Sequence, residues 1–230
     1  MTPEFWKEAW KNQQTGFNQS KPNAMLTHYF DRLAVPKQGH VFVPLCGQSI
    51  DMLWLLSEGY NVVGVELSEL AVNQFFDENN LSIIVSPHLT HPNMTAYQAC
   101  WQEQTITIWV GNFFELSSHD IGQIDAIYDR GALVALPDHA PERMRWQYTQ
   151  HLGQLTNYAN QLLLAFSYNE GENKESINDR SLPPFLVTLE QLDAYYGMQY
   201  QIQLVAKEYA EYVSTKGDSG YRLAYILQNQ

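Results

Sequence analysis

A turn in the first third of the chain combines a glycine and an acidic residue at a spacing that suits a nucleotide. The apolar run 40–45 predicts a buried strand, and the turn that follows contains Gly47. Glu66 stands 19 residues after Gly47, at the end of a second predicted strand, 61–65. Gly47 lets a ligand approach the backbone at the carboxyl end of the first strand, and Glu66 is placed to accept both hydroxyls of an adenosine ribose.

The number of glycines in this turn separates the candidate ligands. Dinucleotide-binding turns carry G-x-G-x-x-G, whereas here Leu45 and Cys46 precede a single glycine. Such a turn suits an adenosine ligand without a pyrophosphate, of which S-adenosylmethionine is the common one. An adenine-dinucleotide oxidoreductase is disfavoured by the missing glycines. The remaining alternative is an ordinary strand-turn-helix, in which Gly47 permits a tight turn and Glu66 is a solvated carboxylate.

Short apolar strands alternate with helical segments along the chain, and this alternation must position the turn. The pattern predicts an α/β fold with a parallel sheet covered on both faces. The expected strands are 40–45, 61–65, 105–110, 124–128 and 161–166, and the expected helices are 3–14, 23–33, 49–57, 142–155 and one that Ser68 opens. The segments 201–205 and 221–227 predict an antiparallel hairpin at the end of the sheet.

Composition narrows the classes of partner and the compartment. The chain has 230 residues, 13 Lys+Arg and 25 Asp+Glu, so its net charge is −12. Cations that neutralise phosphates dominate nucleic-acid binding, which makes this chain a poor candidate for it. An anionic membrane surface would also repel the chain. There is no signal-peptide pattern, no apolar run that could span a bilayer, and only two cysteines. We therefore expect a cytoplasmic protein with no nucleic-acid or membrane partner.

A histidine pair and a cysteine resemble a metal site and a nucleophile, but their sequence surroundings do not support either role. His88 and His91 have the spacing of a metal pair, but no cysteine or carboxylate cluster completes a site, so a loop is favoured and no metal is expected. Cys46 follows a strand, as a nucleophile can, but its surroundings lack the G-x-S-x-G form.

Longer segments resemble a known family. They are PLCGQSIDMLW at 44–54, VVGVELSE at 62–69 and YDRGALVAL at 128–136, preceded by FWKEAW at 5–10 and a Gly-Phe pair at 16–17. In order and in spacing they resemble thiopurine S-methyltransferases, from about residue 3 to residue 185. Motifs of this length are far more specific than one glycine.

The resemblance implies an architecture. It is a Rossmann-like class I methyltransferase fold, with a mostly parallel seven-stranded sheet, an antiparallel C-terminal strand, helices on both faces and an N-terminal helical lid. Residues 1–230 would form a single S-adenosylmethionine-dependent methyltransferase domain, with 1–35 as its helical cap. The family also suggests a monomer.

The resemblance also implies roles for individual residues. The cofactor-binding set would be Trp6, Trp10, Leu45, Gly47, Glu66, Asn112, Phe113 and Arg130. In this set Leu45 holds the methionine end, Glu66 holds the ribose, and Asn112 and Phe113 flank the adenine. Many bacterial members carry Asp where Asn112 stands.

Arg130 and Phe17 would face the substrate, and Arg130 would be the catalytic residue where cofactor and substrate meet. Without the resemblance, a salt bridge with Asp129 or another nearby carboxylate would be the favoured explanation of Arg130.

Two departures from the family's pattern concern the substrate. Leucine precedes the segment Pro-Pro-Phe at 182–185, where the family usually has glycine. A late basic residue is not evident, since 208–213 offers Tyr and Glu. Both departures bear on substrate preference more than on cofactor binding.

The expected activity is S-adenosylmethionine-dependent methyl transfer to the sulfur of small aromatic or heterocyclic thiols. Selenium and tellurium species, which bacterial relatives handle, are further candidate acceptors. An aromatic thiol is largely thiolate near neutral pH, so no strong general base is needed, and Arg130 would steady the anion. The alternative is a catalytically silent nucleotide-binding module, which the changes at Asn112 and in the C-terminal segments motivate.

Overall fold

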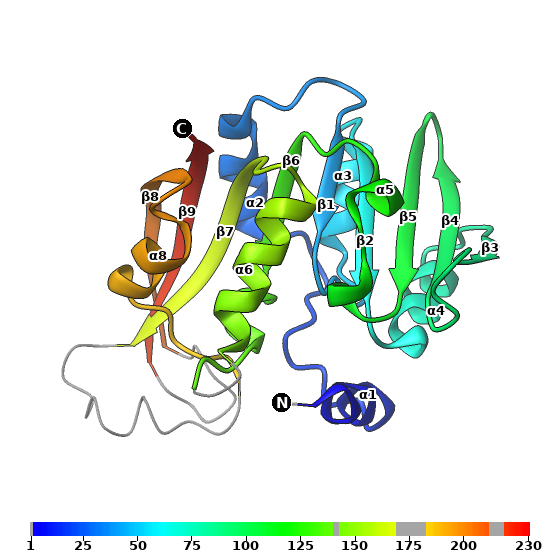
Figure 1. The fold of residues 1–230 in the computed structure, drawn as a ribbon, viewed down its shortest axis with the longest axis horizontal. Coiled ribbons are helices and arrows are strands. Elements are labelled where there is room, and N and C mark those ends of the chain that lie inside the picture. Colours follow the sequence, from blue (N-terminus) through cyan, green and yellow to red (C-terminus); the bar gives the residue numbers. More distant parts are fainter. Residues whose placement is uncertain (1, 140–142, 169–182, 212–218) are drawn as a thin grey trace.

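The computed structural model describes residues 2–139, 143–168, 183–211 and 219–230 (Figure 1). Their strands form one sheet of nine strands in the order β3-β4-β5-β2-β1-β6-β7-β9-β8. The strands are β1 (His40–Val43), β2 (Asn61–Glu66), β3 (Ile84–Pro87), β4 (Thr95–Trp101), β5 (Gln104–Val110), β6 (Ala126–Arg130), β7 (Asn160–Tyr168), β8 (Tyr200–Ala210) and β9 (Gly220–Asn229).

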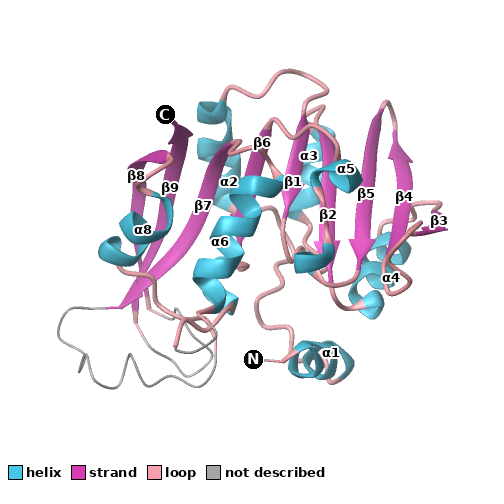
Figure 2. Cartoon of the chain, viewed as in Figure 1, coloured by secondary structure: helices cyan, strands magenta, loops and turns pink. Residues whose placement is uncertain are grey.

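Helices lie in front of and behind this sheet (Figure 2). The α-helices are α1 (Pro3–Lys11), α2 (Ala24–Tyr29), α3 (Asp51–Ser57), α4 (Glu69–Glu78), α5 (Ser118–Ile121), α6 (Met144–Leu155) and α8 (Leu189–Tyr196), and the 3₁₀ turns are η1 (Phe30–Leu33), η2 (Phe113–Glu115) and η3 (Leu133–Ala135). None of the helices described is long and apolar enough to cross a membrane.

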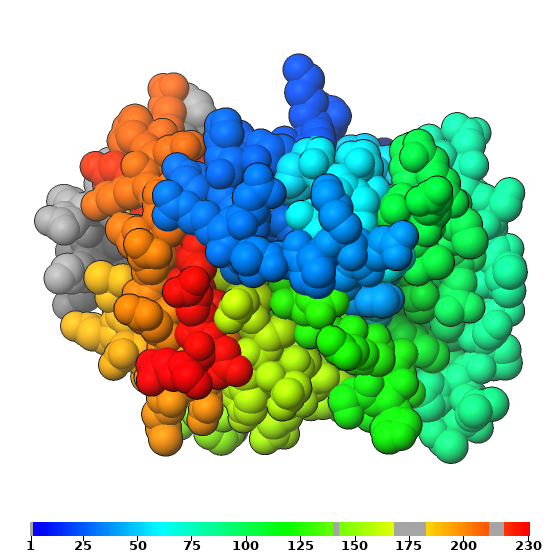
Figure 3. Space-filling model, turned by 90° about the horizontal axis from the view of Figure 1, so that it is seen from above, coloured from blue at the N-terminus to red at the C-terminus, as the bar shows by residue number. Residues whose placement is uncertain are grey.

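The alternation of side chains along β1 explains why both faces of the sheet are covered. Val41 and Val43 pack into the apolar cluster formed by α2, α3 and α4, whereas Phe42 packs into the cluster formed by α6 and α8. All three side chains are buried. Seen from above, the blue segment that contains α2 and η1 and the yellow-green segment that contains α6 and β7 lie toward opposite sides of the molecule (Figure 3).

The order in which successive strands join the sheet reverses at β1, and this reversal determines where a ligand can bind. Along the chain β1 is followed by β2 on one side, while β6 pairs in parallel on its other side. In open α/β sheets the crevice at the carboxyl ends of the strands at such a switch point is the ligand site. In Figure 1 the carboxyl ends of the parallel strands form the lower edge of the sheet, and helix α1 lies below that edge.

The predicted parallel centre of the sheet and its antiparallel C-terminal strand are confirmed, but the described residues form nine strands rather than the expected seven. The strands β5, β2, β1, β6 and β7 pair in parallel, and the C-terminal β9 runs antiparallel between β7 and β8, as the hairpin prediction required. The sequence patterns did not reveal the β3–β4 hairpin. Strand β3 is mostly exposed and ends in Pro87, and only its first two residues are apolar, so it does not show the longer apolar run of a buried strand.

Element boundaries differ from the predictions at several ends. The first helix ends at Lys11 rather than at residue 14, and the expected helix 23–33 is α2 followed by the tighter turn η1. Helix α6 begins at Met144. The predicted start at residue 142 lies outside the described residues. Helix α8 was not predicted, although the capping box of Thr188 and Gln191 was a signal for it.

Candidate active site

The predicted pair of Gly47 and Glu66 meets at the carboxyl ends of β1 and β2. Glu66 is the last residue of β2 and is only 6% exposed. Its Oε2 accepts a hydrogen bond from the backbone N–H of Gly47 at 2.9 Å, and its Oε1 accepts one from the N–H of Ser68 at 2.8 Å. Glu66 is therefore a buried and oriented carboxylate, and the alternative of a solvated loop residue is wrong.

This carboxylate fits the ribose of an adenosine ligand. The carboxylate has four acceptor sites, and the N–H groups of Gly47 and Ser68 take one on each oxygen, so acceptor capacity remains for a ribose hydroxyl. Burial raises the pKa of Glu66, while the N–H groups of Ser68, Gly47 and Leu67 oppose that shift. Next to the turn, the side-chain oxygen of Gln48 is buried without a partner among the described residues, and sequence reasoning missed this acceptor.

The turn that holds Gly47 has an unusual backbone that tertiary contacts stabilise. Leu45 has φ +45° and Gly47 has φ +53°, the left-handed region that leucine rarely adopts. The N–H of Cys46 donates to the carbonyl of Val65 at 2.9 Å and so anchors the turn to β2. A Cβ on Gly64 would come within 2.9 Å of the Cys46 sulfur, so the glycine makes room for the turn.

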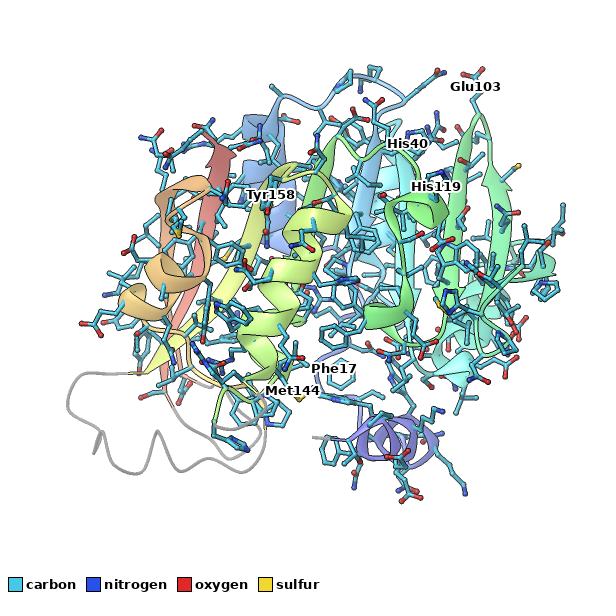
Figure 4. All side chains as sticks on the ribbon, in the orientation of Figure 1. Phe17, His40, Glu103, His119, Met144 and Tyr158 are labelled. Carbon is cyan, nitrogen blue, oxygen red and sulfur yellow. The ribbon has the colours of Figure 1, made fainter. Side chains whose placement is uncertain are left out.

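Three aromatic side chains of the N-terminal segment lie over this turn. Trp10 is 3% exposed, and a Cβ on Gly47 would lie 2.8 Å from its ring. Phe17 packs edge-on against Trp10, with ring centroids 5.5 Å apart, and against Trp6 at 6.1 Å. Figure 4 shows Phe17 in the lower half of the molecule, just above α1, whereas His40 and His119 lie in the upper half. The structure thus places the Trp10 ring against Gly47, with Phe17 packed on Trp10 and Trp6 packed on Phe17.

Arg130, at the end of β6, has its guanidinium held by three segments. Its Nε donates to Oδ2 of Asp51 at 2.6 Å and its Nη2 to the hydroxyl of Ser49 at 2.7 Å. Its Nη1 donates to the backbone carbonyl of Phe17 at 3.1 Å. Burial lowers the pKa of Arg130 and the Asp51 charge raises it, with a net increase. The carboxylate partner is therefore Asp51 and not Asp129.

Asp51 is a residue of this site that sequence reasoning missed. It lies at the start of α3, where a carboxylate is ordinary, and its partners are remote in sequence. Its side chain is fully buried and also accepts hydrogen bonds from the Tyr128 hydroxyl at 2.9 Å and from the N–H of Asn23 at 2.8 Å.

Asn112 and Phe113 follow β5 at the same edge of the sheet. Asn112 is exposed and its Oδ1 accepts the N–H of Phe114 at 3.2 Å, which caps η2. Phe113 is 3% exposed and packs on Tyr148 and His151, whereas Phe114 is 37% exposed. The ring of Phe113 is therefore part of the apolar core beneath α6, in the same cluster as Tyr148.

Asp129 supports the turn that follows Arg130. Its Oδ1 accepts the N–H groups of Ala132 and Leu133, both at 3.2 Å, and its Oδ2 accepts the hydroxyl of Tyr148 at 2.8 Å. Burial raises the pKa of Asp129 to about 6, against the opposing effect of these hydrogen bonds. Asp129 faces the helix α6 side of the sheet and Arg130 the opposite side.

The histidine pair and Cys46 remain outside the proposed chemistry. The Nε2 of His88 lies 2.7 Å from Oδ1 of Asp120, which ties the β3–β4 loop to α5. No cluster of metal-ligating side chains occurs in the part of the chain that the structure describes. Burial, with the nearby Glu66 charge, raises the pKa of the Cys46 thiol, which disfavours the thiolate that a nucleophile needs.

The strand order reverses at β1, a one-glycine turn follows β1, and β2 ends in a buried carboxylate; together these features are those of the class I methyltransferase type of α/β protein. Solved methyltransferases share the fold. A S-adenosylmethionine-dependent methyltransferase from Anabaena variabilis matches 99% of this chain and 95% of its own with a TM-score of 0.61 at 13% identity. A Burkholderia thailandensis N1-methyltransferase, solved with bound S-adenosylhomocysteine, matches 99% and 87% with a TM-score of 0.60 at 15% identity.

Sequence comparison defines the family. The family model for thiopurine S-methyltransferase matches residues 1–222. A thiopurine S-methyltransferase of Psychrobacter cryohalolentis is 44% identical, with 88% of each chain covered. One of Acinetobacter baylyi is 34% identical over 99% of this chain and 98% of its own. The chain belongs to the thiopurine S-methyltransferase family, and it is an S-adenosylmethionine-dependent methyltransferase.

Replacing Gly47 by alanine tests the contact between the turn and α1. The new methyl group would lie 2.8 Å from the Trp10 ring and the backbone would stay at positive φ. We expect Gly47→Ala to weaken S-adenosylhomocysteine binding at least tenfold in calorimetric titration, roughly 1.4 kcal/mol. The control is Gly122→Ala, which also has positive φ but nothing within 4 Å of its Cβ. It should lose stability and keep its affinity; equal affinity for Gly47→Ala would contradict the contact.

The raised pKa of Asp129 makes a signed prediction about stability. Between about pH 4 and pH 6 the folded protein binds more protons at Asp129 than the unfolded chain, so this group's contribution to the free energy of unfolding falls as pH rises. The loss by pH 7 is about 3 kcal/mol for this shift. We expect Asp129→Asn to flatten the pH dependence of urea unfolding in this window. An unchanged slope would show that Asp129 titrates normally.

Proposed function

We propose that the chain transfers the methyl group of S-adenosylmethionine to the sulfur of a small aromatic or heterocyclic thiol. The observation that carries this is the place of Arg130 at the carboxyl edge of the sheet, where its guanidinium donates to the backbone carbonyl of Phe17, the residue whose ring packs on Trp10. A cation next to aromatic rings suits a ring that carries an anionic sulfur. The family name of the relatives supports the same acceptor class.

The cofactor site that we propose follows the turn and the strand ends. Glu66 accepts the ribose hydroxyls, the Gly47 turn with Leu45 admits the methionine end, and Asn112 with Phe113 borders the adenine. Of that last pair, only Asn112 has an exposed side chain, so its carbonyl would accept from the adenine amino group while Phe113 supports it from the core.

The aromatic side chains and Arg130 complete this proposed arrangement. Trp6 and Trp10 cover the cofactor, and Phe17 and Arg130 contact the acceptor. We also propose that residues 1–35 act as a helical cap on a single domain of residues 1–230. The protein would work as a cytoplasmic monomer with a small-molecule partner and no nucleic acid or membrane.

The chemistry needs positioning rather than a covalent step on the protein. S-adenosylmethionine, when bound, supplies an activated methyl group on a sulfonium. The residues of the chain then have to align the acceptor sulfur and exclude water, which lowers the activation barrier by several kcal/mol. Trp6, Trp10 and Phe17 exclude water, and Arg130 holds the anionic sulfur or its ring. No residue has to accept a proton from an acceptor that is already a thiolate.

Binding of S-adenosylhomocysteine tests the cofactor site. At a concentration 100-fold above Kd, ligand binding stabilises a protein by about 2.7 kcal/mol, which for this size raises Tm by about 5–10 °C. We expect this shift for the wild type. We also expect it for the control Glu58→Gln, because Glu58 caps the C-terminal end of α3, whereas the site lies at the N-terminal end of that helix. Glu66→Gln should lose most of it, because an amide accepts fewer hydrogen bonds than a carboxylate. A wild type without a shift would contradict the proposed site.

A methyl-transfer screen tests the acceptor. We expect methylated product from labelled S-adenosylmethionine with aromatic and heterocyclic thiols, and loss of turnover in Arg130→Met with these acceptors. Selenite and tellurite belong in the same screen, as the further acceptors that the resemblance implied. Cofactor binding without product from any acceptor would instead support a catalytically silent module.

A further inference from the structure

We propose that Asp51 is a positioning residue which, through Arg130, latches the N-terminal segment onto the active site. The inference rests on the proposed site and adds a residue to it. It starts from one observation: the buried ion pair of Asp51 and Arg130 contacts both ends of the loop between Phe17 and Asn23.

The two contacts come from opposite sides of the pair. Nη1 of Arg130 donates to the carbonyl of Phe17, and Oδ1 of Asp51 accepts the N–H of Asn23, the residue that caps α2. The loop between these points is polar and mostly exposed, and leads from the aromatic cover to the body of the protein. The ion pair therefore fixes where the loop leaves the site and where it rejoins the core.

The pair itself is held rigidly at the sheet. Asp51 is fully buried, and its Oδ2 also accepts the Tyr128 hydroxyl at 2.9 Å. The Arg130 side chain is 15% exposed and spans Asp51, Ser49 and the Phe17 carbonyl. A planar guanidinium with fixed N–H directions can make these three contacts at once, and a lysine ammonium cannot.

This arrangement leaves donor capacity on the nitrogen that holds Phe17. Nη1 of Arg130 has two N–H groups and donates one of them to the Phe17 carbonyl, so the second can serve an anionic acceptor or cofactor group. A ligand bound to Nη1 and the carbonyl of Phe17 thus share the same guanidinium. This couples the closure of the N-terminal segment over the site to the binding of a ligand there.

Proteolysis of the ligand-free protein tests the latch. Lys11 ends α1 and is exposed, so trypsin cleavage after Lys11 reports how often the N-terminal segment detaches. We expect Asp51→Asn to speed this cleavage about tenfold, the factor for losing one hydrogen bond to a charged group. S-adenosylhomocysteine should leave the variant about tenfold faster than it leaves the wild type.

Additional variants separate the latch from general destabilisation. Arg130→Lys keeps the buried charge and should also speed cleavage, and the double variant should be no faster than the faster single one, because both act through the same contact. Asp120→Asn alters a different contact, the one with His88, and should change cleavage less than twofold.

Two results would overturn the proposal. One is wild-type cleavage in Arg130→Lys or in a folded Asp51→Asn, and the other is a double variant in which the two effects multiply. The assay uses no methyl acceptor. A failure of the thiol screen therefore leaves this test intact, and a failure of the latch leaves the proposed acceptor intact.

Discussion

The hydrogen bond from the Gly47 N–H to the Glu66 carboxylate connects the two loops on which the site depends. It joins the turn after β1 to the end of β2 at the point where the sheet reverses direction. Because the carboxylate is buried, its desolvation is offset only if it stays hydrogen-bonded, which holds the turn near β2. The same turn brings Gly47 under Trp10, so the covering helix is positioned by it as well.

Charge gives the second constraint. The chain carries −12, so its overall field disfavours an anionic acceptor, and the local field must come from a fixed cation. Arg130 is such a cation: Asp51 holds it in place, and its Nη1 donates to the backbone carbonyl of Phe17 at the site. Asp129 lies next to it in sequence but faces the other side of the sheet, where Tyr148 is its partner.

The parts of the site that a sequence reveals are those built from local pattern. Gly47 and Glu66 sit at the ends of consecutive strands, so strand and turn patterns were enough to bring them together. Asp51 was not predictable, because its hydrogen-bond partners Tyr128 and Arg130 are 77 and 79 residues away. The burial of Phe113 depends on packing against Tyr148 of α6, which the local sequence does not reveal. The β3–β4 hairpin was missed because β3 is short and mostly exposed.

The most direct test of the proposed site is an experimental structure of the protein with S-adenosylhomocysteine. We expect both ribose hydroxyls within hydrogen-bond distance of the Glu66 carboxylate, and the sulfur end beneath Trp10 and near Arg130. Glu66 should keep its bonds to the N–H groups of Gly47 and Ser68. An adenosine bound elsewhere, or a Glu66 without contact to the ribose, would contradict the account.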